Sequence, residues 1–147
     1  MHIKTHIDIL ADADAVWRVL AHTESYAAWN PFVRELSGKL EAGQKLRALI
    51  QPPGKSAMVF KPRVVVAEPG QRLMWRGHLL MPGLFAGEHE FRIETLEPGR
   101  VRFHQEEAFS GMLLPFMRSS LRRHVAGGFD AMNAALKARV EQPAGVV

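Results

Sequence analysis

The feature that most constrains this chain is a long apolar stripe near its end, in the stretch from about residue 111 to residue 141. At about 100° per residue from Leu114, apolar side chains recur within roughly 60° of one direction for about seven turns. The stripe comprises Met117, Leu121, Val125, Gly128, Phe129, Met132, Ala135 and Leu136. This pattern predicts a helix of about 30 residues and about 45 Å, which only a broad sheet could cover.

The chain before this stretch has the patterns of that sheet. Ile3, Ile7 and Ile9 alternate with polar residues, which indicates a first strand with one wet face. Two short helices are expected after it, because Asp and Thr residues can cap them and Asn30-Pro31 ends the second.

Turn motifs rich in Gly and Pro divide the next part of the chain at short intervals. They predict six strands near residues 32–40, 44–51, 57–67, 72–80, 87–96 and 100–109. The expected fold class is therefore α+β, with a seven-stranded antiparallel sheet, two short helices after the first strand and the long C-terminal helix.

Length and composition limit the other classes of protein. The 147 residues predict one domain over residues 1–142 and a short tail over 143–147. The absence of cysteine excludes disulfides, and the N-terminus has no continuous apolar segment, so we expect a cytoplasmic protein without stable membrane insertion. The net charge is +4, but the basic residues are dispersed, so we expect no nucleic-acid partner.

Four motifs resemble a known superfamily. They are the run from Ala13 to Trp17, the Trp29-Asn30-Pro31-Phe32 corner, the run from Leu73 to Gly77, and Phe109-Ser110-Gly111 before the last helix. Together they resemble the bacterial SRPBCC proteins of the START and Bet v 1-like superfamily, in the polyketide cyclase or dehydrase-like branch. The resemblance implies a helix-grip fold, in which a curved seven-stranded sheet wraps the long helix around an apolar cavity. It implies no particular reaction, because members include ligand carriers, hormone receptors, cyclases and chaperone regulators.

Polar side chains interrupt the inward face of the last two expected strands. Strand alternation places His89 on the same side as Phe91, and it places Gln105 and Glu107 on the same side as Phe103. These polar residues are candidates for contact with a ligand in the cavity.

The register of this last hairpin has two alternatives. A turn about Pro98 sets His89 opposite Glu107, whereas a turn about Gly99 sets Glu107 opposite Phe91. The first register gives a buried pair that could serve as general acid and base, or could orient the polar end of a ligand. Both residues could also simply bond to each other or to water at the rim of the cavity.

The long helix contributes two further candidates. Arg118 falls inside the stripe and could clamp an anionic group over the cavity, or could extend its charged end to solvent. Gly128 either lets the sheet approach closely or leaves volume for a ligand. The apolar loop over residues 79–86 is expected to be a gate over the cavity, or a contact with a membrane or with a second subunit in a homodimer.

The main hypothesis is a module that binds a small hydrophobic or amphipathic molecule in the central cavity, lipids included. Its expected contacts are Trp75, His89, Phe91, Phe103, Gln105, Glu107, Arg118, Leu121, Val125 and Gly128. The alternatives are a cyclase or dehydratase in which His89 and Glu107 move protons on a ketide-like substrate, and a module that binds a protein partner as chaperone regulators do. We expect no cofactor and no metal, since the chain has no phosphate-binding loop and no histidines at ligand spacing on an inward face.

Overall fold

The structure is a computed structural model that describes residues 1–79, 81 and 83–142. The expected tail over 143–147 lies outside the described residues, as do two positions of the expected gate over 79–86. The elements in chain order are β1 (His2–Ile9), α1 (Ala13–Ala21), the 3-10 turn η1 (Thr23–Ser25), α2 (Tyr26–Trp29), β2 (Val33–Ser37), β3 (Arg47–Ile50), β4 (Met58–Phe60), β5 (Arg63–Glu68), β6 (Arg72–Leu79), β7 (Phe85–Glu97), β8 (Arg100–Ser110) and α3 (Leu114–Glu141).

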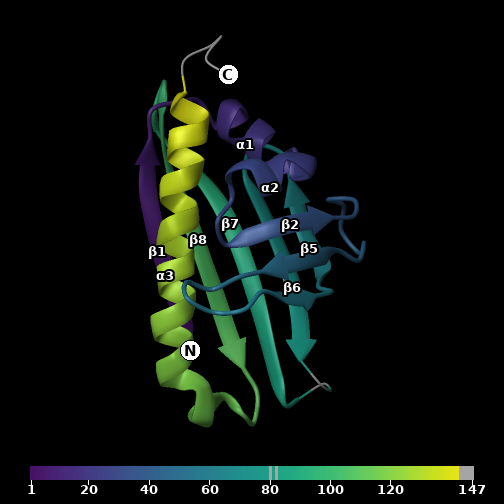
Figure 1. The fold of residues 1–147 in the computed structure, drawn as a ribbon. Helices are drawn as coiled ribbons and strands as arrows, with labels where there is room; N and C mark the ends of the chain where they lie inside the picture. The colour runs from purple at the N-terminus through teal and green to yellow at the C-terminus, as the bar shows by residue number, and fades with distance from the viewer. Residues whose placement is uncertain (80, 82, 143–147) are drawn as a thin grey trace.

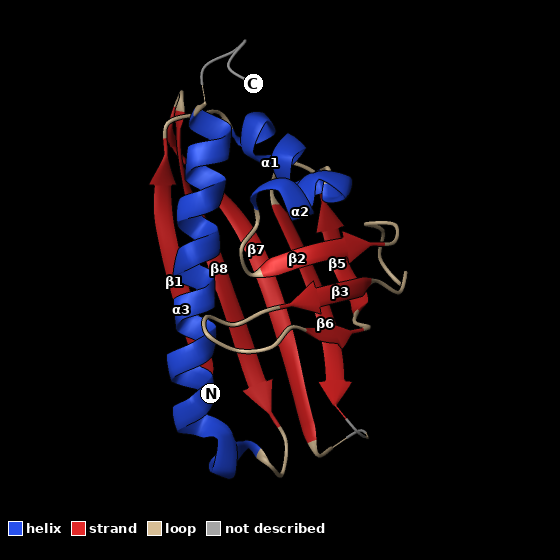
Figure 2. Cartoon of the chain, viewed as in Figure 1, coloured by secondary structure: helices blue, strands red, loops and turns tan. Residues whose placement is uncertain are grey.

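The strands form two antiparallel sheets that lie with α3 in a helix-grip arrangement. The larger sheet has five strands in the order β1-β8-β7-β6-β5, and the smaller one has three in the order β2-β3-β4. Helix α3 runs along β1 and β8, and the smaller sheet crosses in front of the larger one beside the helix (Figure 1). The α+β class, the antiparallel pairing, the two short helices and the long C-terminal helix are thus confirmed (Figure 2).

The described part of the chain has one strand more than the sequence predicts, because the segment over 57–67 divides between the two sheets. Phe60 on β4 pairs with Ala48 of β3, whereas Val64 on β5 pairs with Trp75 of β6. Pro62 lies between them and has no N–H to donate to a continuous ladder. The chain therefore changes sheets at this residue.

The last hairpin adopts the first of the two registers considered. His89 pairs with Glu107 and Phe91 pairs with Gln105 across β7 and β8. The connection contains Gly99 at a φ of +80°, a conformation that residues with a Cβ rarely adopt. This register sets the inward polar side chains of the two strands opposite one another.

Helix α3 has buried side chains near its start and within its C-terminal half, and it is only partly buried between them. Leu114 is 6% exposed near the start, and Phe129 and Leu136 are fully buried in the C-terminal half. Leu121 and Val125, between these ends, are only partly buried. The predicted stripe is therefore real, but its middle does not pack tightly on the sheet.

Gly128 lets Phe32, the residue just before β2, approach the helix. A Cβ at this position would collide with the ring of Phe32. That ring packs edge-on against Phe129, with the centroids 5.6 Å apart. The glycine therefore accommodates a phenylalanine of the protein.

Charged pairs cover the outer face of the larger sheet. Arg102 Nε donates to Asp8 Oδ1 at 2.7 Å, and the same arginine lowers the pKa of Asp8. His104 Nε2 lies 2.9 Å from Glu94 Oε1, and this contact lowers the pKa of Glu94. This face is the wet side that the strand alternation predicts. Within the described ranges, the structure contains no helix that is both long and apolar enough to cross a membrane.

Candidate functional site

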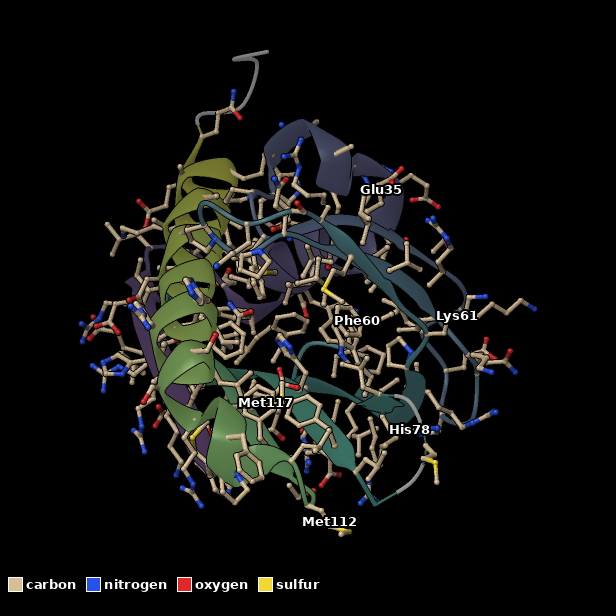
Figure 3. The ribbon with its side chains drawn as sticks, turned by 60° about the horizontal axis from the view of Figure 1, so that its bottom comes forward. Glu35, Phe60, Lys61, His78, Met112 and Met117 are labelled. Atoms are coloured by element: carbon tan, nitrogen blue, oxygen red, sulfur yellow. The ribbon has the colours of Figure 1, made fainter. Side chains whose placement is uncertain are left out.

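A cavity of about 650 Å³ lies between the middle of α3 and the inner face of β6, β7 and β8. The smaller sheet and the loop from β3 to β4 close its other side. Figure 3 shows two residues that border it, Met117 of α3 and Phe60 of β4. The side chains that border it are mostly apolar, and they include Phe32, Ile50, Met58, Phe60, Trp75, Leu79, Phe85, Phe109, Met117, Leu121 and Val125.

Two polar side chains meet at the wall of this cavity. His89 Nδ1 lies 3.2 Å from Glu107 Oε1. His89 is only 2% exposed, and its ring lies among Trp75, Phe91 and Phe129 with centroid distances of 5.0, 4.6 and 4.9 Å. The imidazole is thus held by aromatic rings on several sides, and one of its nitrogens faces the carboxylate.

A glycine makes room for this carboxylate. A Cβ on Gly87 would collide with Oε2 of Glu107. The carboxylate therefore lies over the backbone of β7, where any side chain in place of the glycine would displace it.

Behind His89, a chain of buried amides connects the two strands to α3 and β1. His89 Nε2 lies 3.1 Å from Gln105 Oε1, and Gln105 Nε2 donates to Asn133 Oδ1 at 2.7 Å. Asn133 Nδ2 donates to Thr5 Oγ1 at 2.9 Å, and the Thr5 hydroxyl donates to the backbone oxygen of Gln105 at 2.9 Å. We call the set Glu107, His89, Gln105, Asn133 and Thr5 the polar relay.

The structure brings about half of the sequence-predicted contacts to the cavity surface. The residues that border it are Trp75, His89, Glu107, Leu121 and Val125. Phe91, Phe103 and Gln105 are buried behind that surface, and Gly128 is buried against Phe32. Arg118 is exposed on α3 and does not border the cavity, which agrees with the alternative of an arginine directed to solvent.

Sequence reasoning missed two members of the polar relay. Asn133 lies four residues after Phe129 and three before Leu136, a spacing that puts it at the edge of the buried helical face. Thr5 lies in line with Ile3 and Ile7 of the first strand. The local pattern places both residues on an inward face. It does not show that the two polar side chains form a hydrogen bond with each other. The segment from 52 to 60 was missed altogether as part of the cavity wall.

The described residues contain no cluster of three or more His, Asp or Glu side chains with the geometry of a metal site. At the cavity wall, the imidazole of His89 and the carboxylate of Glu107 are groups that can form hydrogen bonds and transfer protons.

The sequence of the chain matches a known protein family. The family model described as polyketide cyclase / dehydrase and lipid transport matches residues 1–141. No curated protein matches the chain in sequence.

Solved structures share the fold at low sequence identity. The Zhui aromatase/cyclase from a Streptomyces species is 20% identical with a TM-score of 0.72, and the match covers 99% of both chains. A START superfamily protein from Mycobacterium smegmatis is 19% identical with a TM-score of 0.74, over 96% of this chain and 97% of that one. The hypothetical protein jhp0584 from Helicobacter pylori is 17% identical with a TM-score of 0.78, over 96% of this chain and 88% of that one. At these identities the likeness concerns the fold alone.

The helix-grip fold agrees with these neighbours, and the family match extends over nearly the whole chain, which confirms the resemblance stated from the motifs. The protein therefore belongs to the polyketide cyclase / dehydrase and lipid transport family.

Proposed function

We propose that this protein binds a small hydrophobic or amphipathic molecule in the cavity between α3 and the sheets. The observation that carries the proposal is the cavity itself, whose volume of about 650 Å³ lies within the usual range of about 300–1,000 Å³ for ligand sites. Its surface is mostly apolar and includes a few polar groups, among them the His89–Glu107 pair, which is the common form of a site for such ligands. Trp75, Leu121 and Val125 contact the apolar body of the ligand, and Glu107 and His89 contact its polar part.

The proposal is tested by native mass spectrometry of the freshly purified protein, followed by solvent extraction and titration with Nile red. We expect a defined adduct that leaves on denaturation, or saturable binding of Nile red by the emptied protein. Leu121→Trp fills the cavity from α3 and should weaken Nile red binding at least tenfold. Arg122→Trp, on the exposed side of the same helix, is the matched control and should leave binding unchanged.

Two results would contradict the binding function. One is a protein with no adduct and no saturable binding of Nile red. The other is an equal loss of binding in the two tryptophan variants, since only Leu121 borders the cavity.

An enzyme of the cyclase or dehydratase type is the second candidate. It is favoured by the distance of 3.2 Å between His89 Nδ1 and Glu107 Oε1 at the cavity wall, which suits transfer of a proton to or from a bound ketide-like molecule. The test is the double variant His89→Ala with Glu107→Gln, assayed on a linear poly-β-ketone substrate. Loss of turnover with retained binding supports the enzyme, and loss of affinity without any turnover in the wild type supports the carrier.

A further inference from the structure

The polar relay has a fixed direction, because a backbone carbonyl stands at each end of its amide part. Gln105 Nε2 lies 3.5 Å from the carbonyl oxygen of Phe129, where only the NH₂ side of the amide can be accommodated. At the other end, the Thr5 hydroxyl is committed as a donor to the carbonyl of Gln105, so Thr5 Oγ1 accepts from the NH₂ group of Asn133. Both ends give the same orientation for the two amides.

This direction determines the proton on one nitrogen of His89. With its NH₂ group turned to Asn133 and Phe129, Gln105 presents its oxygen to His89 Nε2. An amide oxygen accepts and cannot donate, so Nε2 carries a proton and donates it.

The contact of His89 with Glu107 then contains one proton. If Nδ1 and the carboxylate were both unprotonated, two lone pairs would face each other across 3.2 Å. The proton lies either on Nδ1, beside a carboxylate, or on Oε1, beside a neutral imidazole. In both arrangements the pair is neutral overall, and Oε2 of Glu107 is a hydrogen-bond acceptor.

Oε2 is the atom of this pair that remains available to a ligand. Among the described residues, no donor forms a hydrogen bond with Oε2 of Glu107. Glu107 borders the cavity, and its side chain is 16% exposed. It is the only carboxylate among the described residues of the cavity wall, which also includes backbone or side-chain atoms of Lys55, Lys61 and His124. Glu107 therefore offers the cavity a hydrogen-bond acceptor at a mostly apolar wall, and its pair with His89 carries no net negative charge.

We propose that the ligand presents a neutral hydroxyl group, phenolic or alcoholic, to Glu107 Oε2 at the inner wall of the cavity. This inference rests on the proposed binding function and specifies its ligand class as a hydroxylated apolar molecule. A neutral donor is favoured over an ammonium group, because His89 already neutralises the carboxylate and the other ionisable groups of the wall are basic. An ether or a hydrocarbon of the same shape leaves Oε2 desolvated without a partner.

The test compares three probes of one shape class by isothermal titration calorimetry: 2-naphthol, 2-methoxynaphthalene and the 2-naphthylmethylammonium ion. We expect 2-naphthol to bind at least tenfold more tightly than each of the others, since a hydrogen bond to this acceptor is lost in the ether and the cation gains nothing from a neutral pair. In Glu107→Met the preference for naphthol over the ether should fall to within twofold. Glu106→Met, on the outer face of the same strand, is the matched control and should keep the preference.

The possible results distinguish failure of the hydroxyl inference from failure of the binding function. Equal affinity of the wild type for 2-naphthol and 2-methoxynaphthalene overturns the hydroxyl inference and leaves the binding function in place. Tightest binding of the ammonium ion overturns the neutral pair. No binding of any probe, with no Nile red binding, overturns the binding function and this inference with it. The wild-type comparison decides the question even if Glu107→Met does not fold.

Discussion

We expect alanine to have opposite effects on the free energy of unfolding at two adjacent glycines of α3, Gly127 and Gly128. Alanine favours a helix over glycine by about 1 kcal/mol. A Cβ on Gly127 would meet only Pro53 Cγ, at an ordinary contact distance of 3.6 Å. Gly127→Ala should therefore raise the free energy of unfolding by about 1 kcal/mol.

Gly128→Ala adds the same methyl group where the ring of Phe32 already stands. That ring is 3% exposed and packs edge-on against Phe129, so moving it away from a new methyl group would break this contact. Overpacking of this kind costs about 3 kcal/mol at the upper end of its usual range. After the helix gain of about 1 kcal/mol, we expect a net destabilisation of about 2 kcal/mol and a difference of about 3 kcal/mol between the two variants.

Urea unfolding followed by tryptophan fluorescence measures both variants against the wild type, and thermal unfolding checks the order. At about 3 °C per kcal/mol for a chain of this length, the midpoints of the two variants should differ by about 9 °C. Equal stabilisation by both alanines would refute the reasoning, because it would mean that Phe32 does not occupy the space beside Gly128.

Three further predictions concern polar groups. Gln105→Leu leaves the His89 Nε2–H and the Asn133 oxygen without partners, so it should lower the free energy of unfolding by about 3 kcal/mol in urea titrations. Arg102 lowers the pKa of Asp8, so the stability from this pair is present above about pH 4 and is lost as the pH falls through the pKa of Asp8 in the folded protein. Asp8→Asn lacks this contribution, so it should show a smaller loss of Tm than the wild type between about pH 5 and about pH 3. Burial raises the pKa of Tyr26, so wild-type stability should fall as the pH rises above about 10, and Tyr26→Phe should remove that fall while costing about 1 kcal/mol at neutral pH.

Each of these predictions has a contrary result. Wild-type stability in Gln105→Leu would show that the buried amides are not committed to one another. Identical acid profiles for Asp8→Asn and the wild type would remove the ion pair as a source of acid sensitivity. An alkaline loss that persists in Tyr26→Phe would assign that loss to another group.

Local patterns were enough to predict most of the fold. The period of the apolar residues in α3 and the alternation in β1, β7 and β8 each depend on a few neighbouring positions, and each was readable before any contact was known. The division of the segment over 57–67 was not predicted, because it depends on two different partner strands. Pro62 was the available signal, since proline rarely lies within a continuous strand.

In the candidate site, only the residues whose inward position follows from the alternation within a single strand were predictable. His89 and Glu107 follow from alternation, although their register needed the hairpin geometry. The bond between Asn133 and Thr5 joins residues 128 positions apart, and neither residue shows its partner in its own local pattern. The close approach of Phe32 to Gly128 has the same long-range origin.

The way α3 is held has a consequence for how this protein can diverge. The helix is fixed near its start by Leu114 and along its C-terminal half by Phe129 and Leu136. The span between these anchors borders the cavity instead of packing on the core. Truncating a residue in the span, such as Leu121, enlarges a space that already exists, whereas truncating Leu136 opens a new void in a packed core at about 2–5 kcal/mol. Substitutions in the span can therefore change which molecules fit while the anchors preserve the fold, so selectivity and stability are free to evolve at separate positions of one helix.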